Sequence, residues 1–323
     1  MRLKLVPSCL LLIGLCICLM SEESRLRNAL ASNTGQIVFE SRRDGNTEIY
    51  KMDADGGNQE RLTNHPWADI HPDWSPDGTK IAFASRRDTG RYQIHVMDPD
   101  GKNVIRLTEG LGQKGHPDWS PDGRKIAFTV DNRGKYHIAV LDVDENNRKK
   151  LIDQAAVPAW SPDGAEIAFV SWRDGGHDIY LVGADGQGLK RVTHDLTRKW
   201  APSFSPDGRR IAYVVHKHLT LGQIYVVGVD GKKPVRLTPN DKNYWGPAWS
   251  PDGQMIAYNV YEDGDSGTIH LMASDGRYIR QLSDGRNARD SEPDINPLGL
   301  AVFPASNEST TWGKLKIIEL NRR

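Results

Sequence analysis

The stretch HPDWSPDGTKIAF at residues 71–83 is repeated almost letter for letter as HPDWSPDGRKIAF at residues 116–128. The shorter pattern W-S-P-D-G-x-x-I-A-F recurs as WSPDGTKIAF (74), WSPDGRKIAF (119), WSPDGAEIAF (160), FSPDGRRIAY (204) and WSPDGQMIAY (249), with a decayed copy, INPLGLAVF, from residue 295. The glycines of these copies are separated by 45, 41, 44, 45 and 46 residues. A period in the low forties with short apolar runs in each unit is typical of a β-propeller.

Each repeat is predicted to fold into four strands. The first contains the tryptophan (PDWS, 72–75), the second is KIAFAS (80–85), the third is YQIHVMD (92–98) and the fourth is IRLT (105–108). Their β-branched and aromatic residues favour strands over helices. The Ser-Pro-Asp-Gly segment suits a type I turn, because proline presets φ at the second position. The Asp-Gly pair after the third strand predicts a hairpin.

The number of blades depends on strands that the repeat leaves unmatched. Seven second strands (from 37, 81, 126, 167, 211, 256 and 300) and seven third strands (the last from 314) are found, whereas tryptophan-type and RLT-type strands number six each. Because second and third strands form the middle of a blade, we predict an all-β propeller of seven four-stranded blades, with NALASN (28–33) as a candidate first strand. Six blades are the alternative, in which the sixth tryptophan-type strand closes the first blade.

The N-terminus differs in composition from the repeats. Arg2 and Lys4 precede an apolar run that extends to residue 20, so residues 1–20 are interpreted as a signal peptide or an N-terminal anchor. The run is shorter than the roughly 20 apolar residues that span a bilayer, which favours an export signal. We expect residues 21–35 to be a short linker and residues 36–323 to form the propeller.

The three cysteines, Cys9, Cys16 and Cys18, all lie in this leader. The exported part is therefore predicted to contain no disulfide and no thiolate metal site. Cys16 and Cys18 are candidates for lipid attachment of the bacterial lipoprotein type. The predicted location is periplasmic or extracellular, with membrane contact only through the leader if it is retained or lipidated.

The charge distribution bears on the class of partner. The chain has 42 basic and 42 acidic residues, and the two kinds are interleaved along its length. A duplex-binding protein would usually carry a basic excess or a basic stripe. The sequence therefore predicts no nucleic-acid partner.

The recurring pattern P-x-W-S-P-D-G-x-x-I-A-F, R-D-G, I-Y, D-G and R-L-T resembles the propeller repeat of TolB, the periplasmic protein of the bacterial Tol–Pal envelope system, and of TolB-like proteins. The resemblance covers nearly all of the chain from Gln36 onward. About fifteen residues separate the leader from the first predicted strand, so the N-terminal α/β domain of TolB is not expected here. Related repeats in prolyl-oligopeptidase-type peptidases accompany an α/β-hydrolase domain with a G-x-S-x-G motif, which this sequence does not contain.

Candidate ligand-binding residues lie just before the recurring proline of the first strands, where a propeller loop enters the central channel. His71 and His116 occupy this position in neighbouring repeats, and Glu292 occupies it in another. Trp200 and Trp245 lie one residue earlier. Histidine and carboxylate groups at a channel mouth are suited to bind a metal or an anion, as the histidines of propeller-fold oligogalacturonate lyases do. The tryptophans are suited to stack on a sugar or to anchor a peptide, and packing against the next blade is the structural alternative for all five.

The sequence contains no nucleophile constellation, no metal set and no phosphate-binding loop. We therefore predict an exported, non-enzymatic propeller that acts as a scaffold for a protein or peptide of the cell envelope, without catalytic residues, cofactor or resident metal. One alternative is a polysaccharide lyase or glycosidase-type enzyme that uses His71, His116 and Glu292 at the channel mouth. Another is a propeller that assembles with a separate catalytic chain.

Overall fold

The computed structural model describes residues 35–297, apart from residues 196, 218–220, 262–265, 278 and 286–287. The described residues form six antiparallel sheets of four strands each. The predicted all-β propeller is therefore found, whereas the prediction of seven blades is wrong. None of the described residues belongs to a helix that is long and apolar enough to cross a membrane.

The four strands of each sheet follow one another from the centre of the ring outward. Blade 1 consists of β24 (Ser291–Ile295), β1 (Gln36–Ser41), β2 (Glu48–Asp53) and β3 (Glu60–Arg61). Blade 2 consists of β4 (Asp69–Trp74), β5 (Ile81–Ser85), β6 (Gln93–Met97) and β7 (Ile105–Arg106), and blade 3 of β8 (Gln113–Trp119), β9 (Lys125–Asn132), β10 (Lys135–Asp142) and β11 (Asn147–Asp153). Blade 4 consists of β12 (Ala155–Trp160), β13 (Glu166–Ser171), β14 (Asp178–Gly183) and β15 (Lys190–Arg191), and blade 5 of β16 (Arg198–Phe204), β17 (Arg210–Lys217), β18 (Leu221–Gly228) and β19 (Val235–Arg236). Blade 6 consists of β20 (Asn243–Trp249), β21 (Met255–Tyr261), β22 (Gly267–Ala273) and β23 (Arg280–Gln281).

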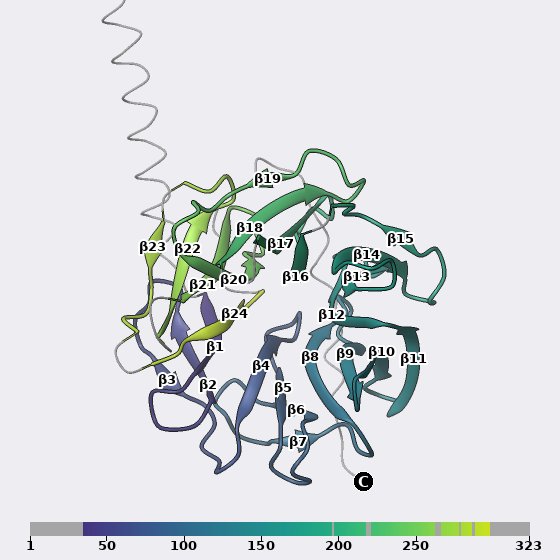
Figure 1. Cartoon of the computed structure of the whole chain (residues 1–323). Helices are drawn as coiled ribbons and strands as arrows, with labels where there is room; N and C mark the ends of the chain where they lie inside the picture. Colours follow the sequence, from purple (N-terminus) through teal and green to yellow (C-terminus); the bar gives the residue numbers. More distant parts are fainter. Residues whose placement is uncertain are drawn as a thin grey trace, which may run out of the picture. The chain divides into compact units, whose positions relative to one another are not determined.

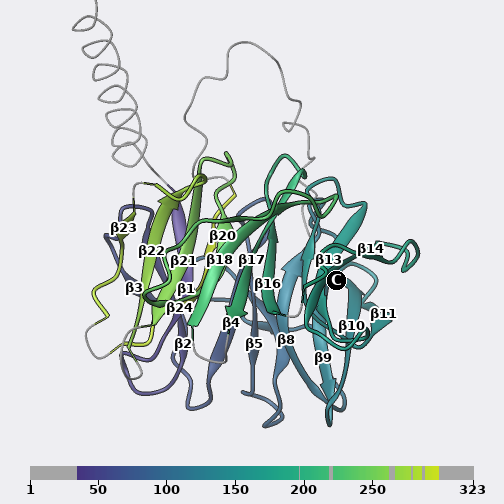
Figure 2. The same cartoon turned by 45° about the horizontal axis from the view of Figure 1, so that its top comes forward.

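Figure 1 shows the six blades arranged as a ring, with β4, β8, β12, β16, β20 and β24 facing its centre and the short fourth strands at its rim. In the tilted view of Figure 2, the strands of each blade run alongside one another from one face of the ring to the other. The first strands of neighbouring blades are in contact all the way round the ring. This arrangement places the segment before each recurring proline at the centre of the molecule.

Blade 1 takes its first strand from the far end of the repeat array, which is why there are six blades. β24 pairs antiparallel with β1, with Ile295 opposite Ile37 and Asp294 opposite Val38. The sixth tryptophan-type strand thus closes the first blade, as the six-blade alternative supposed. The strand expected at residues 28–33, the seventh second and third strands expected from residues 300 and 314, and the predicted leader all lie outside the described residues.

The Ser-Pro-Asp-Gly turns join neighbouring blades as well as neighbouring strands. In blade 2, the Ser75 hydroxyl donates to Oδ1 of Asp77 at 2.6 Å, which fixes the turn. A Cβ atom added to Gly123 of the next blade would lie 3.5 Å from Cγ of Pro76, so the proline ring packs directly on the glycine. The motif recurs because the same residues build the hairpin and the contact between blades.

The Arg-Leu-Thr segments explain how the rim strands can be so short. Thr63 Oγ1 accepts the backbone N–H of Ile49 at 2.9 Å, and Thr108 makes the equivalent bond with Ile94 at 2.9 Å. The threonine side chain therefore satisfies a third-strand donor that a two-residue strand leaves unpaired. Blade 3 has no threonine at this position, and its outer strand β11 extends over seven residues instead.

The apolar core lies between adjacent blades. Between blades 1 and 2 it is formed by Val38, Ile49, Leu62, Trp74, Ile81, Phe83 and Met97. All five residues of β5 are buried, because the sheet has a neighbouring blade on each face. This explains why the second strand is an unbroken apolar run rather than an alternating one.

Replacing Ile295 by alanine is expected to lower the free energy of unfolding by about 2–5 kcal/mol, because the side chain is buried in the closure strand and its removal leaves a cavity. Urea denaturation followed by circular dichroism measures this change. Ile105→Ala is the matched control, since Ile105 is 55% exposed in an outer strand, and its expected effect is below about 1 kcal/mol. Equal effects of the two substitutions would contradict closure of the ring by β24.

Candidate functional site

Every first strand carries a β-bulge at the residue before its proline. In β4, for example, the pairing register shifts between Ile70 and Asp73. The bulge residues have positive φ angles in all six blades: His71 (54°), His116 (50°), Val157 (55°), Ala201 (48°), Gly246 (55°) and Glu292 (49°). This conformation costs a residue with a side chain about 1–2 kcal/mol. Because the bulge recurs in every blade, it belongs to the fold, and the blades differ in the side chain at that position.

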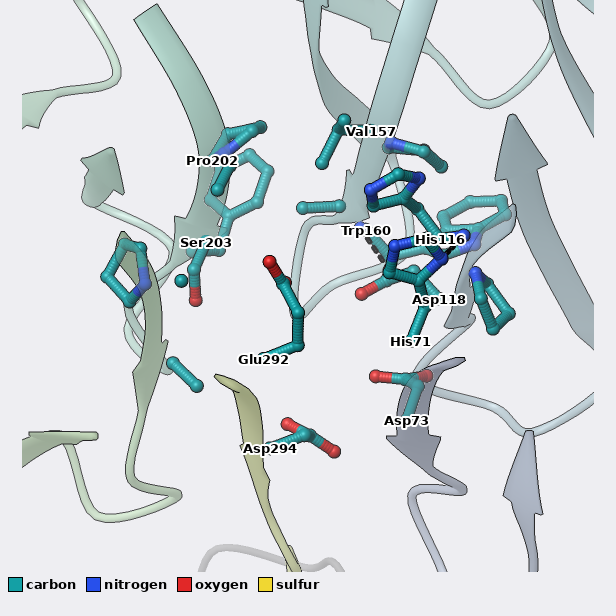
Figure 3. A pocket seen from close by; sticks show the side chains of 18 of the residues that line it. His71, Asp73, His116, Asp118, Val157, Trp160, Pro202, Ser203, Glu292 and Asp294 are labelled. Atoms are coloured by element: carbon teal, nitrogen blue, oxygen red, sulfur yellow. Dashed lines mark hydrogen bonds between the residues drawn. The ribbon is translucent and has the colours of Figure 1, made fainter. Parts of the chain in front are cut away.

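The six bulges surround a central channel with a volume of about 240 Å³. Figure 3 shows Glu292 extending from β24 into this space, opposite His71 and His116. The residues two positions after the bulges also line the channel, and they are Asp73, Asp118, Ala159, Ser203, Ala248 and Asp294. None of the described residues that line the channel is a lysine or an arginine. The channel is therefore acidic.

Each channel aspartate bonds to the blade that follows it. In every case Oδ2 accepts the backbone N–H of the next blade's tryptophan. The pairs are Trp74 N–H to Asp294 at 2.7 Å, Trp119 N–H to Asp73 at 2.9 Å and Trp160 N–H to Asp118 at 2.6 Å. These bonds orient the three carboxyl groups along the channel wall.

The channel aspartates have raised pKa values, because the walls of the narrow channel hold their carboxyl groups largely out of bulk water. Burial raises the pKa of Asp118 to about 8, with a further contribution from the charge of Asp294. Burial also raises the pKa of Asp294 to about 7. The pKa of Asp73 is raised well above its ordinary value by burial and by the charges of Asp294 and Asp118. Burial, and then repulsion between the like charges, therefore keeps part of this group protonated at neutral pH.

His71 and His116 lie face to face on one side of the channel. Their ring centroids are 3.7 Å apart and their planes differ by 23°. Nδ1 of His71 accepts the backbone N–H of His116 at 3.3 Å, which leaves the ring proton of His71 on Nε2. Burial lowers the pKa of His116 to about 4, and burial together with His116 lowers that of His71 well below its ordinary value. Both rings are therefore neutral at pH 7.

Glu40 and Glu292, which belong to the two closure strands, form a second cluster of carboxyl groups. Oε1 of Glu40 accepts the backbone N–H of His71 at 2.6 Å, and Oε2 accepts the hydroxyl of Ser291 at 3.4 Å. Burial, and then the charge of Glu292, raise the pKa of Glu40 to about 8. Burial raises the pKa of Glu292 to about 7. Within the described part of the chain, no group of three or more His, Cys, Asp or Glu residues is placed to hold a metal ion.

A larger cavity, which we call the vestibule, adjoins the channel and has a volume of about 600 Å³. The two cavities share four lining residues, His116, Val157, Ala201 and Glu292. The other residues that line the vestibule are Thr129, Gly134, Tyr136, Ala156, Trp172, His177, Trp200 and Trp245. The vestibule therefore combines an aromatic lining with one carboxyl group.

Aromatic rings from four blades form an arc along the vestibule. Tyr136 meets Trp172 edge to face with 5.4 Å between ring centroids, and His177 meets Trp200 in the same way at 4.9 Å. Trp172 and His177 are 5.7 Å apart and join the two pairs. Trp245 continues the lining into blade 6. Edge-to-face contacts fix the rings relative to one another, so the arc is a preformed apolar surface.

The structure brings all five predicted ligand-binding residues to these two adjoining cavities. His71 lines the channel, Trp200 and Trp245 line the vestibule, and His116 and Glu292 line both. The histidines stack on each other. Ligand binding by these five residues stays a prediction.

Sequence analysis did not identify the channel aspartates as site residues. They occur inside the repeat itself, in PDW at 72–74 and 117–119 and in PDI at 293–295. The equivalent positions of the other three blades hold alanine or serine. That difference between copies is the pattern from which they could have been found.

Trp172 was also missed, although the sequence sets it apart. It stands in SWRDG at 171–175, where two sister repeats have SRRDG at 41–45 and SRRDT at 85–89. A tryptophan that replaces a recurring arginine in an exposed hairpin departs from the repeat. In the structure this residue lies at the middle of the aromatic arc.

A match to a protein-family profile identifies the propeller family of this chain. The profile of the TolB beta propeller domain matches residues 26–156 and 88–323. The chain belongs to the TolB β-propeller family. The family resemblance that the repeat indicated is thereby confirmed.

One curated relative of this chain is the Tol-Pal system protein TolB of Geobacter sulfurreducens. It is 48% identical to this chain over 48 residues, which cover 15% of this chain and 11% of the relative. The match thus spans about a tenth of the length of that TolB, and it concerns the repeat rather than the whole protein.

Solved structures of TolB proteins share the fold. TolB from Acinetobacter baumannii aligns with a TM-score of 0.73 and 26% identity over 81% of this chain and 67% of that one. A putative TolB from Agrobacterium tumefaciens aligns with a TM-score of 0.64 and 22% identity over 81% of this chain and 98% of that one. Oligogalacturonate lyase from Vibrio parahaemolyticus has a TM-score of 0.53 and 14% identity over 76% of this chain and 74% of that one, which indicates a shared fold alone.

The free energy of unfolding is expected to fall as the pH rises from about 7 to about 8.5. An aspartate whose pKa is raised in the folded state, such as Asp118 at about 8, contributes stability below its unfolded pKa and loses it as the pH rises through the folded pKa. The buried histidines do not oppose this trend, because histidine is largely neutral in both states above pH 7. Asp118→Asn is expected to reduce the fall by on the order of 1 kcal/mol.

Urea denaturation at the two pH values measures this difference. The side-chain amide introduced by Asp118→Asn keeps an oxygen that can accept the N–H of Trp160, so the substitution removes the titration and retains the bond. Glu145→Gln, on an exposed turn, is the control that should leave the pH dependence unchanged. An unaltered slope in Asp118→Asn would contradict a protonated carboxyl in the channel.

Proposed function

We propose that this chain is an exported, non-enzymatic propeller of the TolB family that binds a protein or peptide of the cell envelope in its vestibule. The observation that carries the proposal is the aromatic vestibule of about 600 Å³ at the mouth of the channel. Its volume falls in the range of roughly 300–1,000 Å³ that is typical of ligand cavities. Preformed aromatic surfaces also supply much of the affinity of protein interfaces.

Export and an envelope location are supported by the leader at residues 1–20, which has a basic start and an apolar run. We place the propeller in the periplasm or outside the cell. The relative from Geobacter sulfurreducens is named for the Tol-Pal system, which supports an envelope protein as the class of partner.

The alternative enzymatic function, a polysaccharide lyase or glycosidase, would use His71, His116 and Glu292. The likeness to oligogalacturonate lyase is one of fold and favours no reaction. In the channel, His71 stacks on His116 and accepts its backbone N–H, so one ring nitrogen of the pair is already engaged.

The test is capture of a partner from envelope extract by the immobilised chain. The double variant Trp200→Ala/Trp245→Ala is expected to recover at least about tenfold less of the partner, because an aromatic anchor at an interface contributes about 2 kcal/mol or more. Trp67→Ala is the matched control, since Trp67 is half-exposed and lines neither cavity. Quantitative mass spectrometry of the captured proteins measures the recovery.

Thermal unfolding of each variant verifies that it is folded. Equal recovery by the unmodified chain, the double variant and Trp67→Ala would contradict binding in the vestibule.

To test the enzymatic alternative, the unmodified chain and His71→Ala/His116→Ala are incubated with acidic polysaccharides. Release of unsaturated or reducing sugars by the unmodified chain, but not by His71→Ala/His116→Ala, would support the enzymatic alternative instead.

A further inference from the structure

Among the described residues that line the vestibule and the channel, the side chains that ionise near neutral pH are carboxyl groups. Glu292 reaches both cavities, and Asp73, Asp118 and Asp294 line the channel. Of the described residues that line either cavity, none is a lysine or an arginine. Carboxyl groups in such a space lack a fixed counter-charge, which a bound cation can supply.

Three basic side chains that lie close in sequence to the site residues are bound by other groups. Nζ of Lys114 donates to three carbonyl oxygens of residues 110–112. Nζ of Lys199 lies 2.9 Å from a carboxylate oxygen of Asp178. Nε of Arg42 donates to a threonine hydroxyl at 3.0 Å. These bonds tie Lys114 and Arg42 to their own loop and hairpin, and Lys199 to Asp178 of the neighbouring blade.

An unpaired amide lies against the acidic wall. Asn259 of β21 is fully buried, and neither Oδ1 nor Nδ2 has a hydrogen-bond partner among the described residues. At the equivalent position of other blades, Glu40 and Thr129 accept the N–H of the next blade's bulge residue. A Cβ atom added to Gly246 would lie 2.9 Å from Oδ1 of Asn259 and 3.6 Å from Cα of Glu292. Because Gly246 has no side chain, Asn259 approaches closely behind the channel wall at Glu292, but its amide is buried and lines neither cavity.

The aromatic lining of the vestibule suits the stem of a basic side chain. Aromatic rings pack against methylene groups and attract cations. The Thr129 hydroxyl already accepts the N–H of Val157, and Nε1 of Trp245 already donates to Asn243.

We propose that the vestibule and channel recognise an arginine side chain of the partner, with its guanidinium at Glu292 and its stem along Trp200 and Trp245. The inference rests on the proposed function, because it names the group by which the envelope protein or peptide is held. A guanidinium suits Glu292 better than an ammonium, since its planar array of N–H donors can form two parallel hydrogen bonds with one carboxylate.

The probe is the blocked tripeptide Gly-Arg-Gly, compared with Gly-citrulline-Gly, in which a neutral urea group replaces the guanidinium. Each is titrated into the purified full chain at low salt, with isothermal calorimetry and tryptophan fluorescence as readouts. The expected Kd for the arginine tripeptide is on the order of 1 mM, and that for the citrulline tripeptide is at least about tenfold higher. Equal affinities, or no binding of the arginine tripeptide at about 10 mM, would overturn the inference.

Glu292→Gln keeps the size of the side chain and is expected to weaken binding of the arginine tripeptide at least about tenfold. Glu145→Gln, on an exposed turn, should leave the affinity unchanged. Unchanged affinity in Glu292→Gln would also overturn the inference. If Glu292→Gln still captures the partner that depends on Trp200 and Trp245, the proposed function stands and the arginine inference falls.

Discussion

The antiparallel pairing of β24 with β1 holds the ring closed, because it joins the two ends of the repeat array in one sheet. Without β24, β1 would be an unpaired strand edge, which favours pairing with other chains. The same five-residue strand carries Glu292 and Asp294 into the channel. Asp294 also accepts the N–H of Trp74 in blade 2, so closure continues into the next blade. One strand therefore closes the ring and supplies two of the four carboxyl groups that line the channel.

The repeat predicted the blade well, because the strands, turns and inter-blade contacts of each blade depend on residues that recur. Pro76 packing on Gly123 and Thr63 bonding to Ile49 are local contacts of this kind. The number of blades was predicted wrongly, because it depends on how the ends of the array pair. Local propensity makes the segment from residue 291 a strand, but it does not specify β1 as its partner.

Site residues were predicted from the sequence where the repeats differ at the position before the recurring proline. They were missed where the repeats differ within the Trp-containing motif itself. The residue before each proline varies from histidine to glutamate, so His71 and Glu292 drew attention. The carboxyl group of Asp73 serves the fold and the site together, because it bonds to Trp119 and also lines the channel. Glu40 could not be found from the repeat at all, since only the folded ring brings it beside Glu292.

The backbone of the ring repeats six times, whereas the side chains that line its centre differ from blade to blade. Aspartates line the channel in three consecutive blades, 1 to 3, whereas the equivalent positions of blades 4 to 6 hold Ala159, Ser203 and Ala248. The aromatic arc of the vestibule lies in blades 3 to 6. A lining with sixfold symmetry would offer six equivalent orientations to a ligand. Because the aspartates lie in blades 1 to 3 and the aromatic arc in blades 3 to 6, these orientations differ in energy, which favours one direction for a ligand with one charged and one apolar end.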